Sequence, residues 1–113
     1  MSDIEQRRAP RKRATQRMPV VDVMTEQVIG QLGNLSATGL MLIGHAPRAG
    51  GVYQVAFALR DAQQREHHVQ IGIQEQWQEP AATQGQTWSG YRIVAATDKD
   101  VRAIDEWIGP AAD

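Results

Sequence analysis

The sequence predicts an all-β fold, a small barrel or sandwich that ends in one short helix. Apolar residues recur at every second position in several short segments, and turn residues separate these segments. Near residue 98 the apolar spacing changes from two to three or four, as in a helix that buries one face. The chain has 113 residues, enough for one domain with a modest core.

Six segments have the alternation or the short apolar runs that are typical of strands. They are residues 21–25, 28–32, 40–43, 53–59, 67–74 and 88–95. Residues 61–65 are expected to form a hairpin loop between two of them, although this loop contains no glycine. In the strand that begins at His67, the alternation places Glu75 on the apolar side. We therefore expect a bulge or a change of environment between Gln74 and Trp77.

The period of three to four residues predicts a helix over about residues 98–108, which Thr97 or Asp98 can cap and Gly109-Pro110 ends. Its apolar face is expected to contain Val101, Ile104, Trp107 and Ile108. A helix this short is marginal alone in water. We expect it to close an open end of the barrel or to dock on its side.

Composition excludes several classes of site. The chain has no cysteine, which removes disulfides, thiolate catalysis and cysteine-bound zinc and fits a reducing cytoplasm. No apolar run approaches the ~20 residues that cross a membrane, and the amino terminus has no apolar signal region. The expected localisation is cytoplasmic, without membrane insertion. His67 and His68 are adjacent on a strand and face opposite ways, so no metal site is expected.

The net charge of -1 conceals a basic arm on an acidic body. Residues 1–17 contain six Lys/Arg and two Asp/Glu, whereas the remaining residues contain six Lys/Arg and eleven Asp/Glu. We assign residues 1–18 to the arm and residues 19–113 to the barrel with its helix. Pro10 favours an extended arm that crosses a small anion, and a solvated tail is the alternative interpretation.

A polar turn follows at residues 34–39. Asn34 and Ser36 can bond to local backbone groups, and Gly39 permits a positive φ or a close approach to the main chain. The turn could therefore serve the hairpin alone or lie beneath a bound nucleotide.

Arg7-Arg8-Ala9-Pro10-Arg11 followed by Asn34-Leu35-Ser36-Ala37-Thr38-Gly39 resembles the bipartite signature of PilZ domains, R-x-x-x-R and then [D/N]-x-S-x-x-G. PilZ domains are bacterial receptors for the second messenger cyclic di-GMP. The similarity continues through the strand at Gly90-Tyr91-Arg92-Ile93 to the final helix, and so covers about the whole chain.

The resemblance implies a six-stranded antiparallel β-barrel with a flexible basic arm across one face. The ligand-binding residues carried over from the family are Arg7, Arg8, Arg11, Asn34, Ser36, Gly39 and Trp77. Asn34 replaces the commoner aspartate, a change that removes a negative charge near an anionic ligand. For Trp77, ligand contact and barrel packing both remain open.

The expected function is that of a cyclic di-GMP receptor and adaptor, with no catalytic residues and no cofactor, which passes the signal to a protein partner when the ligand orders its arm. One alternative is a barrel that binds RNA or other single strands, which the acidic body and the few aromatic residues disfavour. Another is a PilZ adaptor in motility or surface assembly that works without ligand.

Overall fold

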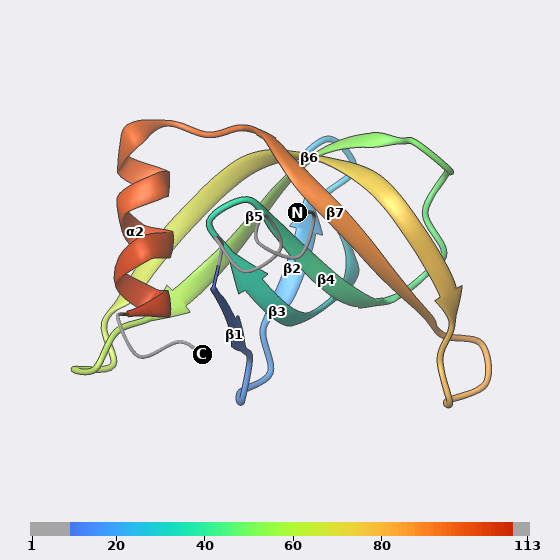
Figure 1. Cartoon of the computed structure of the whole chain (residues 1–113), viewed down its shortest axis with the longest axis horizontal. Helices are drawn as coiled ribbons and strands as arrows, with labels where there is room; N and C mark the ends of the chain where they lie inside the picture. Colours follow the sequence, from blue (N-terminus) through green and yellow to red (C-terminus); the bar gives the residue numbers. More distant parts are fainter. Residues whose placement is uncertain (1–9, 110–113) are drawn as a thin grey trace, which may run out of the picture.

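A computed structural model describes residues 10–109 of the chain, and within them six antiparallel strands form a closed barrel that one helix follows (Figure 1). The elements are β2 (Pro19–Asp22), β3 (Gln27–Ser36), β4 (Gly39–Gly44), β5 (Val52–Arg60), β6 (Glu66–Pro80), β7 (Thr87–Ala95) and the helix α2 (Asp98–Ile108). Neighbours run in the order β3–β2–β5–β6–β7–β4, and pairing of β4 with β3 closes the ring. The fold class predicted from the sequence is confirmed.

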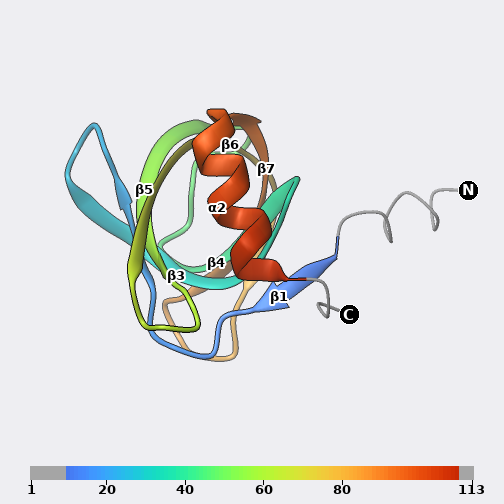
Figure 2. The ribbon, with the colours of Figure 1, turned by 90° about the vertical axis from the view of Figure 1, so that its left-hand side faces the viewer.

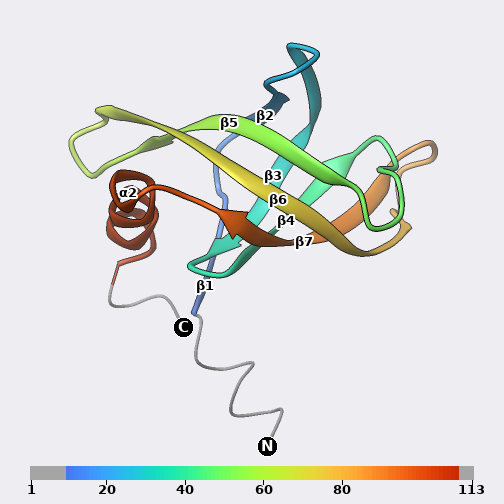
Figure 3. The same cartoon turned by 90° about the horizontal axis from the view of Figure 1, so that it is seen from above.

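A short additional strand, β1 (Arg11–Arg13), lies in the segment assigned to the arm. It pairs antiparallel with β3, so that Arg11 lies opposite Ser36 and Arg13 opposite Asn34. β2 pairs with the earlier part of β3, and β1 occupies the same edge beyond it (Figure 3). This part of the arm is thus an ordered strand of the sheet. Residues 1–9, with Arg7 and Arg8, lie outside the described residues.

The core lies inside the barrel, where alternate residues of the strands meet. On β6, the side chains of Val69, Ile71 and Ile73 are almost completely buried, as the period of two predicts. Burial of each such side chain stabilises the fold by about 1.5–3 kcal/mol. The other buried apolar residues are Met18, Val20, Leu32, Leu35, Leu40, Leu42, Val55, Phe57, Leu59, Tyr91, Ile104 and Ile108.

The expected bulge in β6 is present and is confirmed by a register shift between Glu75 and Trp77. Glu75 is buried, and its carboxylate accepts hydrogen bonds from the Gly50 amide at 2.8 Å and from Gln78 Nε2 at 3.0 Å. Strict alternation after Glu75 would point Trp77 into the barrel. Because the bulge adds a residue to β6, Trp77 lies on the outer face with 43% of its surface exposed.

The β5–β6 hairpin closes without glycine because Asp61 organises its loop. One Asp61 oxygen accepts hydrogen bonds from the amides of Gln63 and Arg65 at 2.9 Å, and the other accepts from Arg65 Nε at 3.0 Å. His67 Nε2 lies 2.9 Å from that second oxygen. Gln64 takes the positive φ of 67° that a glycine commonly supplies.

This loop predicts a pH dependence of stability. The hydrogen bond with His67, followed by the one from the Arg65 amide, lowers the pKa of Asp61 far below its ordinary value of 3.8. A carboxylate with a lowered folded-state pKa stabilises the fold above its unfolded pKa, and this contribution disappears as the pH falls through the folded value. We expect Asp61→Asn to lower Tm at pH 7, and the difference from wild type to shrink below about pH 4. Thermal unfolding at several pH values checks this. A difference that stays constant down to about pH 2 would assign the effect to the change of shape instead of the charge.

The helix α2 begins with a capping box at Thr97. Thr97 Oγ1 accepts a hydrogen bond from the Asp100 amide, and the Asp100 side chain bonds back to the backbone of Thr97. Ile104 and Ile108 are buried against the barrel, and α2 lies across one of its ends (Figure 2). Val101, which was predicted to share this face, is 40% exposed, because Asp100 instead turns toward the strands.

The last turn of α2 contains no basic residue of its own. Lys12 of β1 supplies the missing cation: its Nζ donates to the Trp107 carbonyl at 2.8 Å and lies 4.5 Å from the centre of the Trp107 ring. A cation at the carboxyl end of a helix is stabilising because it faces the negative end of the helix dipole. Among residues 10–109, α2 is the one helix, and it is not long and apolar enough to cross a membrane.

Candidate functional site: a groove at the bipartite motif

The turn between β3 and β4 is fixed by Ser36, whose side chain is fully buried. Ser36 Oγ accepts hydrogen bonds from the amides of Thr38 at 3.2 Å and Gly39 at 3.1 Å, and lies 3.2 Å from the Gly39 carbonyl oxygen. The hydroxyl thus satisfies the backbone of the turn. Its predicted contact with ligand stays a prediction.

Gly39 serves a close approach of two strands, and its φ is not positive. A Cβ at this position would lie 2.5 Å from the Tyr91 carbonyl oxygen of β7. Any side chain would therefore push β4 away from β7. Of the two roles that the sequence allowed for Gly39, the structure shows the close approach to the main chain.

The two halves of the motif meet, although 23 residues separate Arg11 from Asn34 along the chain. Arg11 Nη1 donates a hydrogen bond to Asn34 Oδ1 at 2.9 Å. The pairing of β1 with β3 holds both side chains at the same end of the barrel. Arg11 keeps further guanidinium N–H groups for other acceptors, since one arginine carries five.

The meeting point opens into a groove of about 480 Å³, which we call the motif groove. Its lining residues are Arg11, Asn34, Thr38, Gly39, Leu40, Met41, Gln76, Trp77, Gly90, Tyr91 and Arg92. Four of the residues predicted from the sequence are thus brought together: Arg11, Asn34, Gly39 and Trp77. None of the described residues that line this groove is acidic. The motif groove is therefore suited to an anion.

One wall of the motif groove is aromatic. The Trp77 indole lies directly on the backbone of Gly90, where any Cβ would collide with the ring. Beside it, burial raises the pKa of Tyr91 above its ordinary value of 10.0. Ser89 Oγ lies 3.1 Å from the Tyr91 hydroxyl oxygen and fixes it inside the barrel. Trp77 is thus the ring that offers a free face to a ligand.

Sequence reasoning missed Arg92 as a member of the site. Register places Arg92 of β7 opposite Gly39 of β4, which brings a second guanidinium to the motif groove. Arg92 Nη2 donates to Gln74 Oε1 at 3.2 Å. The available signal was its position between Tyr91 and Ile93, which predicts an outward side chain, but the neighbouring strand could not be read from the sequence.

The other polar clusters of the described residues do not converge on a site. His67 bonds to Asp61, and His68 lies 3.8 Å from Glu66. Within residues 10–109, no group of three or more histidine or acidic side chains is arranged to hold a metal ion.

Comparison with known proteins identifies the fold. No family model and no curated protein matches the chain. Among solved structures, the Bacillus subtilis inhibitor of motility (MotI/DgrA) superposes with a TM-score of 0.72 at 14% sequence identity. The match covers 88% of this chain and 47% of that one, so the chain spans about half the length of its structural neighbour. The two proteins share a fold.

Proposed function

We propose that this protein is a PilZ-type receptor that binds cyclic di-GMP in the motif groove and relays the signal to a protein partner. The observation that carries the proposal is the contact of 2.9 Å between Arg11 and Asn34, one from each half of the bipartite signature. A motif that matched by chance would have no reason to assemble around one groove.

The chemistry of the motif groove suits the ligand. Cyclic di-GMP has two phosphates and two guanine bases, and therefore needs cations, hydrogen-bond donors and stacking planes. Arg11 and Arg92 provide guanidinium forks, which pair with phosphate oxygens or with guanine O6 and N7. The exposed face of Trp77 provides a plane for a base. Arg7 and Arg8 complete the proposed set from outside the described residues.

The proposed role is binding without catalysis, in the cytoplasm. The structural neighbour is named as an inhibitor of motility. For this chain the proposed role is that of an adaptor that acts on a protein partner. The arm is the proposed relay, because β1 contacts the motif groove through Arg11 and the helix α2 through Lys12.

Titration calorimetry of the purified protein tests the proposal. We expect saturable binding of cyclic di-GMP, with GTP and a short RNA at least about tenfold weaker. Tight binding of RNA with a steep dependence on salt would instead support a single-strand-binding barrel. Absence of cyclic di-GMP binding at about 1 mM ligand would leave the ligand-independent adaptor as the surviving hypothesis.

A further inference from the structure

The barrel has an open edge between β2 and β5. Strand β2 has four residues and pairs with β5 only where Val21 lies opposite Ala56 and Asp22 opposite Val55. β5 continues to Arg60 and is paired with β6 over that whole length. Among residues 10–109, no strand pairs with the other edge of β5 beyond Ala56.

The sequence explains why β2 does not cover this edge. Pro19 starts β2 and has no N–H to donate, and a register shift follows between Val20 and Val21. The chain before Pro19 follows β3 instead, since the Met18 carbonyl accepts a hydrogen bond from the Leu32 amide at 2.9 Å. β2 and β5 therefore separate at this point.

The backbone groups on the open edge can be assigned from alternation. In a strand, every second residue directs its N–H and C=O toward the same neighbour. The Gln54 carbonyl bonds to the Val23 amide on the β2 side, and the Asp61 amide bonds to Arg65 on the β6 side. Even-numbered residues of β5 consequently face β2, so Ala58 and Arg60 present their amides and carbonyls, about 6.7 Å apart, to the opening.

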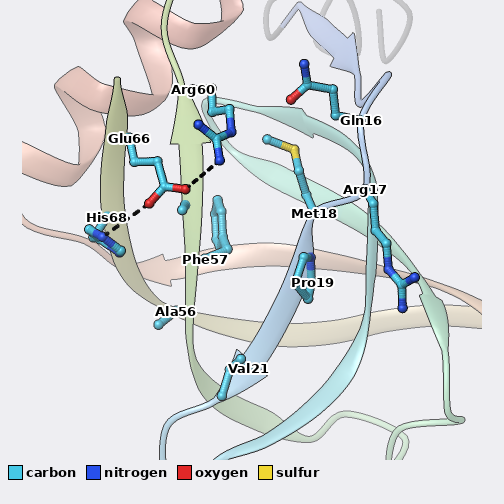
Figure 4. Close-up of a pocket in the computed structure, with 11 residues that line it drawn as sticks. Gln16, Arg17, Met18, Pro19, Val21, Ala56, Phe57, Arg60, Glu66 and His68 are labelled. Atoms are coloured by element: carbon cyan, nitrogen blue, oxygen red, sulfur yellow. Dashed lines mark ion pairs between the residues drawn. The ribbon is translucent and has the colours of Figure 1, made fainter. Parts of the chain in front are cut away.

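This opening is a groove of about 430 Å³, which we call the edge groove. Its lining residues are Gln16, Arg17, Met18, Pro19, Val21, Ala56, Phe57, Ala58, Arg60, Glu66 and His68. It shares none of these with the motif groove. Figure 4 shows the segment from Gln16 to Val21 on one side and β5 on the other. Both sides of the edge groove are therefore formed by this chain.

The charges at the rim favour an acidic occupant. Arg60 forms an ion pair with Glu66, with 2.8 Å between Arg60 Nη2 and Glu66 Oε2. His68 Nε2 lies 3.8 Å from the other carboxylate oxygen of Glu66 (Figure 4). Arg17 is exposed and forms no ion pair with any residue of 10–109. Its side chain points away from β5 in Figure 4, and because nothing among these residues holds it, it can turn toward a carboxylate in the groove. On its inner side the edge groove is apolar, since the buried side chains of Met18 and Phe57 line it.

We propose that the edge groove captures an extended segment of a partner protein, which adds a strand to β5 by bonding to the backbone of Ala58 and Arg60. Alternate side chains of this segment are apolar and face the barrel, toward Met18 and Phe57. The remaining side chains lie on the outer face beside Ala58 and Val21, and a carboxylate among them pairs with Arg17. Capture of this segment does not require cyclic di-GMP, since the edge groove and the motif groove share no lining residue.

Amide hydrogen exchange, read residue by residue with NMR, tests the proposal. In the free protein the amides of Ala58 and Arg60 should exchange faster than those of Phe57 and Leu59, which face β6. The probe is a pool of peptides of about six residues in which every second residue is Val, Ile or Leu and the others are Thr or Glu. At about 1 mM, this pool should slow exchange at Ala58 and Arg60 by about tenfold or more.

Two controls separate strand addition from other binding. The same pool with N-methyl groups on alternate residues keeps the side chains but loses the amides, and it should give no protection. A pool with Lys in place of Glu should bind wild type more weakly, and Arg17→Glu should reverse this preference. Arg102→Glu on α2 is the matched control variant, and it should leave the preference for the acidic pool unchanged.

Three results would overturn the proposal. The first is unchanged exchange at both amides with the acidic pool. The second is protection that survives N-methylation of the peptides. The third is protection in the free protein that rises with protein concentration, which would assign the edge groove to a second copy of the chain.

Discussion

Arg11→Ala should weaken the binding of cyclic di-GMP about ten- to a hundredfold. The variant loses the charged hydrogen bonds that Arg11 offers at the wall of the motif groove, each worth about 1.5–3 kcal/mol. It also releases Asn34 from its contact with β1. Titration calorimetry measures the effect, and a thermal unfolding curve of the same sample confirms that the barrel is intact.

The matched control is Arg102→Ala on α2, which removes the same charge from a site that does not line the motif groove and should leave the affinity unchanged. Arg11→Lys keeps the charge but not the planar fork, and it should fall between the alanine variant and wild type. Wild-type affinity in Arg11→Ala would remove Arg11 from the proposed site, even if the protein still bound cyclic di-GMP elsewhere.

Gly39→Ala should destabilise the barrel by about 1–3 kcal/mol, because the new methyl group would lie 2.5 Å from the Tyr91 carbonyl oxygen. This oxygen belongs to the backbone of β7, so the contact can be relieved only by separating two paired strands. We expect Tm to fall by several degrees. The affinity for cyclic di-GMP should fall as well, because Gly39 lines the motif groove.

Gly72→Ala is the corresponding control in the same sheet. Its nearest neighbour would be the Cβ of Ala95 at 3.2 Å, a contact that a shift of a few tenths of an ångström relieves. We expect a much smaller change in Tm, since alanine also loses less backbone entropy on folding than glycine does. Equal effects of the two substitutions would contradict the close packing of β4 on β7 as the reason for a glycine at position 39.

The strands and the helix could be predicted because their signals are local. Alternation identified the buried face of β6, and Glu75 on that face predicted the bulge that the register shift confirms. The cap at Thr97 likewise depends on a side chain and a backbone three residues apart. Such features require no knowledge of which strands become neighbours.

The features that could not be predicted are those that depend on which residues pair across the sheet and on how long each strand is. Arg92 enters the motif groove because β7 pairs with β4, and Trp77 points outward because the bulge shifts the alternation after Glu75. Neither consequence follows from the residues themselves. The edge groove was missed for a related reason: alternation predicted a strand over residues 21–25, whereas β2 is Pro19–Asp22 and the chain before it follows β3.

Two neighbouring residues of the shortest strand link regions that are otherwise separate. Arg11 touches the turn of β3, and Lys12 touches the last turn of α2, with a single peptide bond between them. A ligand or partner that binds at one of these regions and displaces β1 must therefore change the contacts that β1 makes with the other region. Loss of the Lys12 cation would raise the free energy of the helix terminus by about 0.3–1 kcal/mol. If the motif groove binds the proposed nucleotide, that site and the helix terminus are coupled through β1, and by reciprocity a partner that holds α2 in place would change the affinity for the nucleotide by the same factor.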